Sequence, residues 1–249
     1  MIKRNYYKIV RVFPDPSSYF YIKNETMSEG LIGLWDTEWV SQHSFEYSFD
    51  KVNWTPIRDY WNGKIPADSY MYFRNSSGTF NTENSRSQFH IGVNASIGGD
   101  IRTLFNYTDV DNVTTIPTYG LYMAFQAISD YKIIDISNLS FRGITSISNY
   151  GLYYTFSNSN NWFSITKGVD LRDVTTLGEG ALNNLYSNNS NLKEAYAPNV
   201  STWDTSKVSY WLNSVASTGV VYKPSTLTIP TNYDSGIPSG WTTQDYPVE

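Results

Sequence analysis

The sequence contains no cysteine and only two histidines, His43 and His90. Without cysteine the chain has no disulfide framework, no thiolate metal site and no cysteine nucleophile. The two histidines lie far apart in the sequence and have no ligand-spaced partners, which a zinc site requires. Alternation places His90 on the strand face opposite Phe89 and Ile91 and predicts that it is partly exposed. We therefore expect neither a metal nor a cofactor.

The chain also lacks a basic surface patch and a long apolar run. Its 18 Lys and Arg against 23 Asp and Glu give a net charge of −5, which predicts no nucleic-acid partner. No apolar run approaches the ~20 residues of a membrane-spanning helix, so we expect no membrane insertion. Residues 1–12 carry charges but neither an apolar core nor a small-residue cleavage site, and we expect no signal peptide.

No catalytic set is visible in the sequence, and a glycan-active enzyme ranks last among the function classes considered. Carboxylate pairs such as Asp36 and Glu38 are expected by chance among 23 acidic residues, although such pairs do act on glycosidic bonds. Residues 109–112 begin like an EF-hand loop, but its twelfth position is Gly120 instead of glutamate. Only a looser calcium site stays open there. The sequence favours a protein without enzymatic activity.

Aromatic residues are abundant, at 16% of the chain, with 21 Tyr and 8 Trp. A hydrophobic content of 40% against 16% charged residues indicates a folded protein. Tyrosine and tryptophan offer large, stiff contact areas with a polar tip, which is typical of β-rich, carbohydrate-binding or protein-binding surfaces. The alternative is that a small repeat core needs bulky aromatic side chains to fill it.

Residues 119–222 repeat one unit. The phrase Tyr-Gly-Leu-Tyr-x-x-Phe occurs at residues 119–125 and 150–156, and looser copies follow at residues 181–186 and 211–215. The anchoring leucines of the four copies follow one another at a nearly constant interval, and they are Leu121, Leu152, Leu182 and Leu212. A fixed period of about 20–50 residues is typical of a solenoid.

A second pattern lies between these anchors, at residues 131–139, 166–174 and 192–200. Its central residues alternate with period 2, which predicts short strands with one buried face. Leu121 and Phe125 stand in an i, i+4 relation, which predicts one or two helical turns. Each unit is therefore predicted to be a short helix, a turn and a short strand, stacked with strands on one wall and helices on the other.

This spacing resembles leucine-rich repeats, and most closely the irregular BspA-like kind of bacterial surface proteins and of phages that infect gut Bacteroidetes. The resemblance covers roughly residues 89–241. Two departures are visible: Leu139, Val174 or Val200 stands where the family has Asn or Cys, and a short insertion surrounds 158–162. Closing phrases of such arrays are matched by Tyr222-Lys223-Pro224, Thr228-Ile229-Pro230 and Ile237-Pro238-Ser239-Gly240-Trp241.

Residues 1–88 read as several short strands with polar turns, which predicts a β-sandwich. Expected strands are Tyr6–Val12, Tyr19–Lys23, Leu31–Trp35, Phe45–Phe49 and Tyr70–Arg74. The stretches Phe45–Pro56 and Tyr72–Arg74 resemble the sandwich module that often precedes such repeats in the same proteins. The predicted fold class is α+β, an N-terminal β-sandwich followed by a short leucine-rich-repeat-like α/β solenoid. The predicted domains are the sandwich at 1–88, the solenoid at 89–230, and a C-terminal cap and tail at 231–249.

The resemblance implies a structural protein on the surface of a phage virion, such as a head fibre or a tail-associated fibre of a crAss-like or related phage. The sandwich would attach to the particle, and the solenoid would project towards a host glycan or surface protein. The implied partners are capsid or tail proteins and further copies of the chain, made in the host cytoplasm. A bacterial cell-surface adhesin module with leucine-rich repeats is the alternative.

Three aromatic residues are the candidates for a ligand-binding patch. Trp162 lies in the insertion that breaks the repeat, and insertions in solenoids map to loops that often lie on the binding face. Tyr153 stands one place from the buried Leu152 and is expected to point away from the core. Trp203 follows the strand that ends near Val200. Together they predict a face that packs against the C–H groups of sugar rings.

Overall fold

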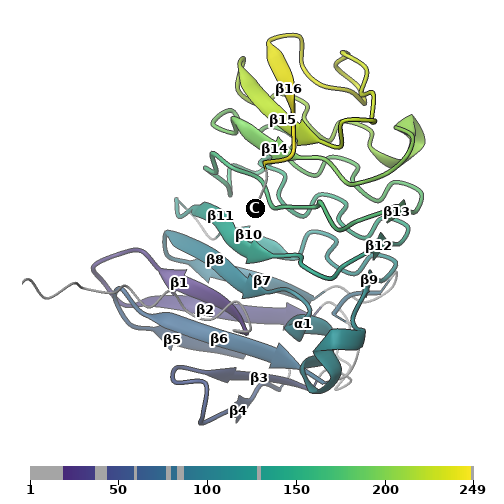
Figure 1. Ribbon diagram of the computed structural model, residues 1–249. Coiled ribbons are helices and arrows are strands. Elements are labelled where there is room, and N and C mark those ends of the chain that lie inside the picture. The colour runs from purple at the N-terminus through teal and green to yellow at the C-terminus, as the bar shows by residue number, and fades with distance from the viewer. Residues whose placement is uncertain are drawn as a thin grey trace, which may run out of the picture.

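The computed structural model of the protein describes residues 19–36, 44–58, 61–76, 80–82, 87–127 and 130–247. Within these residues the chain is mainly β, with strands β1 to β16 and very little helix (Figure 1). The predicted strand Tyr6–Val12 lies outside the described residues. The helical elements are the α-helix α1 (Thr103–Asn106) and the 3-10 helices η1 (Tyr107–Asn112) and η2 (Thr205–Lys207).

The first sheet has six strands in the order β11-β8-β1-β6-β3-β4. Its neighbours are antiparallel except β11, which pairs with β8 in parallel. The strands expected near residues 19–23, 45–49 and 70–74 are all present in it. The six strands are β1 (Phe20–Asn24), β3 (Phe45–Ser48), β4 (Thr55–Pro56), β6 (Tyr70–Asn75), β8 (Ala95–Asp100) and β11 (Ile133–Ser140).

The second sheet has four strands in the order β10-β7-β2-β5. It packs face to face with the first sheet through large aromatic side chains. Phe89 of this sheet lies 4.8 Å from Phe73 and 5.3 Å from Phe20, measured between ring centroids, and all three are fully buried. Its strands are β2 (Gly30–Asp36), β5 (Trp61–Ile65), β7 (Ser87–Gly92) and β10 (Phe125–Ala127).

Alternating burial is clearest in β6. Along β6, Met71, Phe73 and Asn75 are buried while the residues between them are partly exposed. Each buried apolar side chain of this size contributes about 1.5–3 kcal/mol by leaving water. Strand β7 contains residues 88 and 89 and pairs with β2, and the following strand β8 pairs with β1. Backbone hydrogen bonds therefore connect the two sides of the predicted domain boundary at 88/89. That boundary stays a prediction.

Two further sheets are three-stranded and parallel, and Figure 1 shows them on two sides of the C-terminal half. In the first of them Thr115 is aligned with Ser146, and Ser146 with Thr176. The repeat spacing in the sequence thus corresponds to chain segments that lie side by side, here called layers. The strands are β9 (Thr115–Ile116), β12 (Ser146–Ile147) and β13 (Thr176–Leu177), and then β14 (Glu194–Tyr196), β15 (Gly219–Lys223) and β16 (Trp241–Asp245).

The Tyr-Gly-Leu-Tyr phrase is not helical. The amide of Tyr122 donates to the carbonyl of Tyr119 within one turn, at 3.0 Å, whereas the amide of Leu121 donates to Gly151 of the next layer, at 2.8 Å. Successive amides therefore bond alternately within the turn and between layers. Tyr119 and Met123 adopt φ angles of 58° and 48°, in the left-handed region that an α-helix excludes.

The predicted α+β class is therefore wrong, because the described residues are mainly β. The predicted leucine-rich-repeat-like α/β solenoid is also wrong. Its helices are replaced by turns, and the strands of the predicted units are divided among several separate sheets. Leu121 and Phe125 are both buried, as predicted. Their shared burial does not require a helix, because two consecutive turns also place residues i and i+4 on the same side.

The step from Leu182 to the next layer is shorter than the two steps before it. The amide of Leu152 donates to the carbonyl of Ala181, whereas the amide of Leu182 donates to that of Lys207, which follows it after a shorter stretch of chain. Leu182, which follows Ala181, is thus the neighbour of Leu152 in the next layer. In the same way Val208, which follows Lys207, is the neighbour of Leu182. The predicted fourth anchor, Leu212, is buried but lies elsewhere in its layer.

Candidate functional site

The candidate site lies where the ladder of β9, β12 and β13 ends. Thr115, Ser146 and Thr176 are aligned along the outer side of this ladder, and Ile116, Ile147 and Leu177 are aligned along its buried side. β13 is an edge strand of the sheet. The next layer has no matching strand, because its chain is shorter and passes β13 as the loop 200–204. The missing strand leaves a pocket beside β13.

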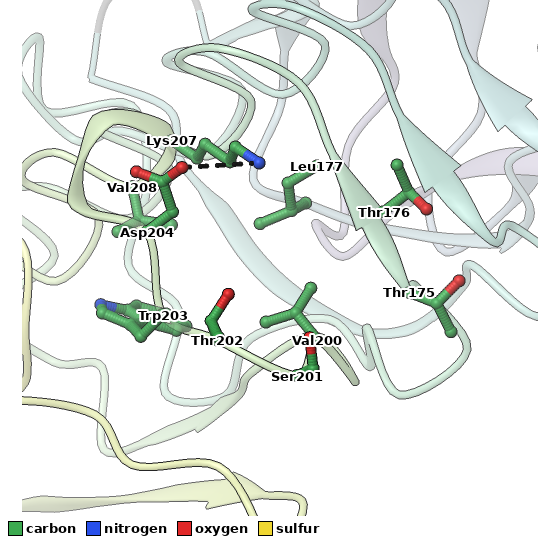
Figure 2. A pocket seen from close by; sticks show the side chains of 10 residues that line it. All are labelled: Thr175, Thr176, Leu177, Val200, Ser201, Thr202, Trp203, Asp204, Lys207 and Val208. Atoms are coloured by element: carbon green, nitrogen blue, oxygen red, sulfur yellow. Dashed lines mark ion pairs between the residues drawn. The ribbon is translucent and has the colours of Figure 1, made fainter.

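The pocket opens between this loop and β13. Figure 2 shows Trp203 and Thr202 on one side and Thr175 and Thr176 on the other, with Leu177 between them. Its volume is about 150 Å³. That is the size of a cavity that holds a benzene ring, and smaller than the roughly 300–1,000 Å³ of pockets for drug-sized ligands. The full lining is Thr175, Thr176, Leu177, Val200, Ser201, Thr202, Trp203, Asp204, Lys207 and Val208.

Trp203 is held in one position by the C-terminal region. Its indole Nε1 donates to the carbonyl of Ser235 at 2.6 Å, and its ring lies 5.0 Å from that of Trp211, between centroids. Trp211 is fully buried and donates in turn to the carbonyl of Gly236 at 2.8 Å. Trp203 itself is half-buried against this core. A ligand that packs on Trp203 therefore meets a side chain that has little conformational freedom left to lose.

Asp204 and Lys207 supply the two charges of the pocket. The Lys207 Nζ lies 3.5 Å from the Asp204 Oδ2, shown as the dashed line in Figure 2. The Asp204 Oδ1 accepts hydrogen bonds from the hydroxyl of Ser206 at 2.7 Å and from its amide at 3.0 Å. These hydrogen bonds, with the nearby charge of Lys207, hold the pKa of Asp204 below its usual range. The carboxylate therefore stays ionised at neutral pH.

The rest of the lining combines exposed hydroxyl groups with a smaller apolar part. Thr176 and Thr202 are exposed, whereas Leu177 and Val208 are buried. Such a surface suits a molecule of one ring that has C–H groups on its faces and hydroxyl groups at its edge. A pyranose sugar has this character, and an aromatic ring beside polar groups is the usual way that proteins orient such a ligand.

The structure places the three predicted binding residues at different points, and no ring contact joins any two of them among the described residues. Trp203 lines the pocket. Tyr153 lies in a group of tyrosines, 5.3 Å from Tyr122 and 4.4 Å from Tyr154 between centroids, where burial raises its pKa to about 12. Trp162 is half-buried, and its carbonyl accepts from the amide of Ile133 at 2.8 Å. Roles for Tyr153 and Trp162 in binding stay predictions.

Sequence reasoning missed Thr176, Asp204 and Lys207. A signal for Asp204 was present, because an aspartate shortly before Ser206 is typical of a capping turn, and its side chain does cap η2. The only sequence signal for Thr176 was that a serine or threonine recurs at this position of the repeat, as at Thr115 and Ser146. The pocket itself was not predictable, because it depends on the shorter step from Leu182 to Lys207.

His90 is buried, and the prediction that it is partly exposed is wrong. Its ring stacks on Trp35 at 3.7 Å between centroids, and the indole Nε1 of Trp35 donates to Asn62 at 3.1 Å. The outward face of β7 is therefore covered at this point. Burial lowers the pKa of His90 to about 4, so the imidazole is neutral at neutral pH. His43 lies outside the described residues.

Other features of the described residues add no second site. The stretch considered for calcium forms η1, where Asn112 donates to Asp109 at 2.8 Å. No group of three or more His, Asp or Glu side chains among the described residues is placed to hold a metal ion. Glu38, of the carboxylate pair Asp36 and Glu38, lies outside the described residues. The longest described helices are far too short to cross a membrane.

The chain was compared with protein-family models, with curated proteins and with solved structures. None of the three comparisons finds a match.

Proposed function

We propose that the protein is a binding protein on the surface of a phage particle, a head fibre or a tail-associated fibre, that adheres to a glycan of the host surface. The single observation that carries the binding role is the pocket beside β13, with Trp203 fixed at its side. A ring-sized pocket with hydroxyl groups, a small apolar part and a fixed indole matches the chemistry of a sugar unit.

The location on a particle is supported by the sequence resemblance to surface repeats of bacteria and their phages. Under this proposal the protein attaches to capsid or tail proteins and works as several copies. A weak single-sugar contact then becomes strong through multivalency, because each further copy binds at a high effective concentration. No enzymatic step is part of the proposal.

A bacterial cell-surface adhesin module is the second candidate, and the same pocket would serve it. The two differ in where the chain resides. Purification of intact phage particles, followed by mass spectrometry of their proteins, separates them. The proposal expects the chain to remain with the particles through density-gradient centrifugation, and its absence from every particle fraction would favour the adhesin.

The binding role is tested with a variant that blocks the pocket and a matched control. Thr176→Arg places a long side chain at the pocket, whereas Thr115→Arg makes the same change two strands away on the same ladder. Both threonines are exposed, so we expect both variants to fold. Labelled Thr115→Arg protein should bind host cells as the unaltered protein does, and Thr176→Arg should lose at least tenfold. Equal binding by the two variants would contradict a role for this pocket.

A further inference from the structure

We infer that the pocket beside β13 selects an uncharged sugar and that Asp204 is the residue that excludes acidic sugars. The inference rests on the proposed function and deepens it, because it names the chemical class of the ligand. It follows from the arrangement of charge and hydrogen-bonding groups at the pocket.

The charges that line the pocket compensate each other. Asp204 and Lys207 are the charged residues of the lining, and they lie within 3.5 Å of each other. Both are partly accessible, with 45% and 34% of their side-chain surfaces exposed. An anionic ligand that approaches Lys207 also approaches the carboxylate of Asp204, and the repulsion offsets the attraction. The pocket therefore gives an acidic sugar no net electrostatic gain.

The same pair suits hydroxyl groups. A carboxylate offers about four acceptor positions, and the contacts of Asp204 with Ser206 and Lys207 leave acceptor capacity free. An ammonium group has three donors, and Lys207 directs one of them towards Asp204. The pocket thus presents an acceptor and a donor side by side. Neighbouring hydroxyl groups of a sugar donate and accept in the same way, so a neutral ring satisfies both.

Two substitutions separate the charge of Asp204 from its structural role. Asn is as good a helix-capping residue as Asp, so Asp204→Asn keeps the hydrogen bond from the Ser206 amide while it removes the negative charge. Lys207 is then uncompensated and attracts anions. Lys207→Met removes the positive charge and keeps most of the side-chain length, which leaves Asp204 to repel anions alone.

The test uses pairs of probes that differ in one group, the neutral methyl glycosides of glucose, galactose and mannose and the corresponding methyl uronates. Affinities are measured by titration at low and at high salt. We expect the unaltered protein to prefer the neutral member of its best pair by tenfold or more, because a uronate loses hydration of its carboxylate in the pocket and gains no net attraction in return. Asp204→Asn should reduce this preference at least fivefold at low salt and less at high salt, because salt screens exposed charges. Lys207→Met should retain it.

The outcomes are distinguishable. A preference for uronates in the unaltered protein, or an unchanged preference in Asp204→Asn, overturns the inference and leaves sugar binding by the pocket intact. If neither member of any pair binds, both the inference and the glycan part of the proposed function fail. If Asp204→Asn does not fold, Lys207→Met decides. A gain of uronate binding in that variant also overturns the inference.

Discussion

The two halves of the molecule use backbone hydrogen bonds differently. In strands β1 to β8 neighbouring segments are antiparallel, and their backbone hydrogen bonds join one strand to the next within a sheet. In the layers after residue 113, amides bond alternately within a turn and to the next layer, as those of Tyr122 and Leu121 do. The first half depends on antiparallel pairing within its sheets, and the second depends on hydrogen bonds between successive layers.

This difference explains why the pocket is in the second half. Antiparallel strands tolerate turns of any length, because only the paired segments must match. In stacked layers a shorter segment can keep the pairing on one side and lose it on the other, as β14 stays paired with β15 whereas β13 has no next strand. The step from Leu182 to Lys207 is shorter than the step from Leu152 to Ala181. The pocket beside β13 lies at that step, so a change in layer length creates a concave surface.

The largest expected effect is in the regular layers. Leu152 is fully buried in the core, and Leu152→Ala should lower the free energy of unfolding by about 2–5 kcal/mol. In the antiparallel half, the matched control Leu31→Ala removes a leucine that is 51% exposed and should change stability by less than about 0.5 kcal/mol. Chemical denaturation measures both. Similar losses for the two variants would contradict the burial assigned to the layers.

The next effect is a pH dependence that belongs to the antiparallel half. The pKa of His90 is lowered to about 4 from an ordinary value of 6.5. Between these values the unfolded chain binds a proton that the folded chain does not, so stability falls as the pH falls from about 6.5 to 4. The loss from this residue is about 2–3 kcal/mol. His90→Gln should flatten the curve of unfolding free energy against pH in this window, and an unchanged slope would show that His90 is not the cause.

A smaller effect probes the bonds between layers. The side-chain amide of Asn189 is buried and donates to the carbonyls of Phe156 at 2.6 Å and Tyr186 at 3.0 Å. Asn189→Ala leaves those carbonyls without this donor and should cost about 1–3 kcal/mol. Asn183→Ala provides the comparison, because the half-buried Asn183 instead accepts from the amide of Ser209 near the shorter layer. Thermal unfolding should rank Asn189→Ala as the more destabilising, and the reverse order would contradict this account.

The smallest expected effect on stability comes from the substitution that closes the pocket. Thr176→Arg and Thr115→Arg both alter exposed positions and should change the unfolding free energy by about 0.5 kcal/mol or less. Thermal unfolding checks this directly. A large loss for Thr176→Arg alone would mean that the pocket wall is part of the core and that the binding comparison between the two variants is not valid.

The sequence indicated much of the first half and the spacing of the second. Short apolar and aromatic runs between polar turns located β1, β2, β3 and β6, and residues 45–49 also showed the period 2 of a half-buried strand. The secondary structure of the repeated Tyr-Gly-Leu-Tyr segment was predicted wrongly, since buried apolar residues at i and i+4 occur both in a helix and in two successive turns. What distinguishes the turns from a helix is the left-handed backbone of residues such as Tyr119 and Tyr150. A sequence signals this conformation clearly only where the residue is glycine.

The pocket was less accessible to prediction than the strands. Trp203 was singled out as an aromatic residue in a loop, and it does line the pocket. Its neighbours Asp204 and Lys207 were missed because the leucine spacing suggested a regular fourth layer anchored at Leu212. The hydrogen bond from Leu182 to Lys207 fixes the alignment instead, and such a bond depends on how the layers stack.

A crystal structure of the protein soaked with its best-bound neutral methyl glycoside would show directly whether the pocket beside β13 holds the sugar. We expect one sugar ring beside β13, packed on Trp203, with hydroxyl groups within hydrogen-bond distance of Asp204 and Lys207. Density for the sugar over Tyr153 or Trp162 instead, or an empty pocket at a concentration that saturates binding in solution, would contradict this expectation.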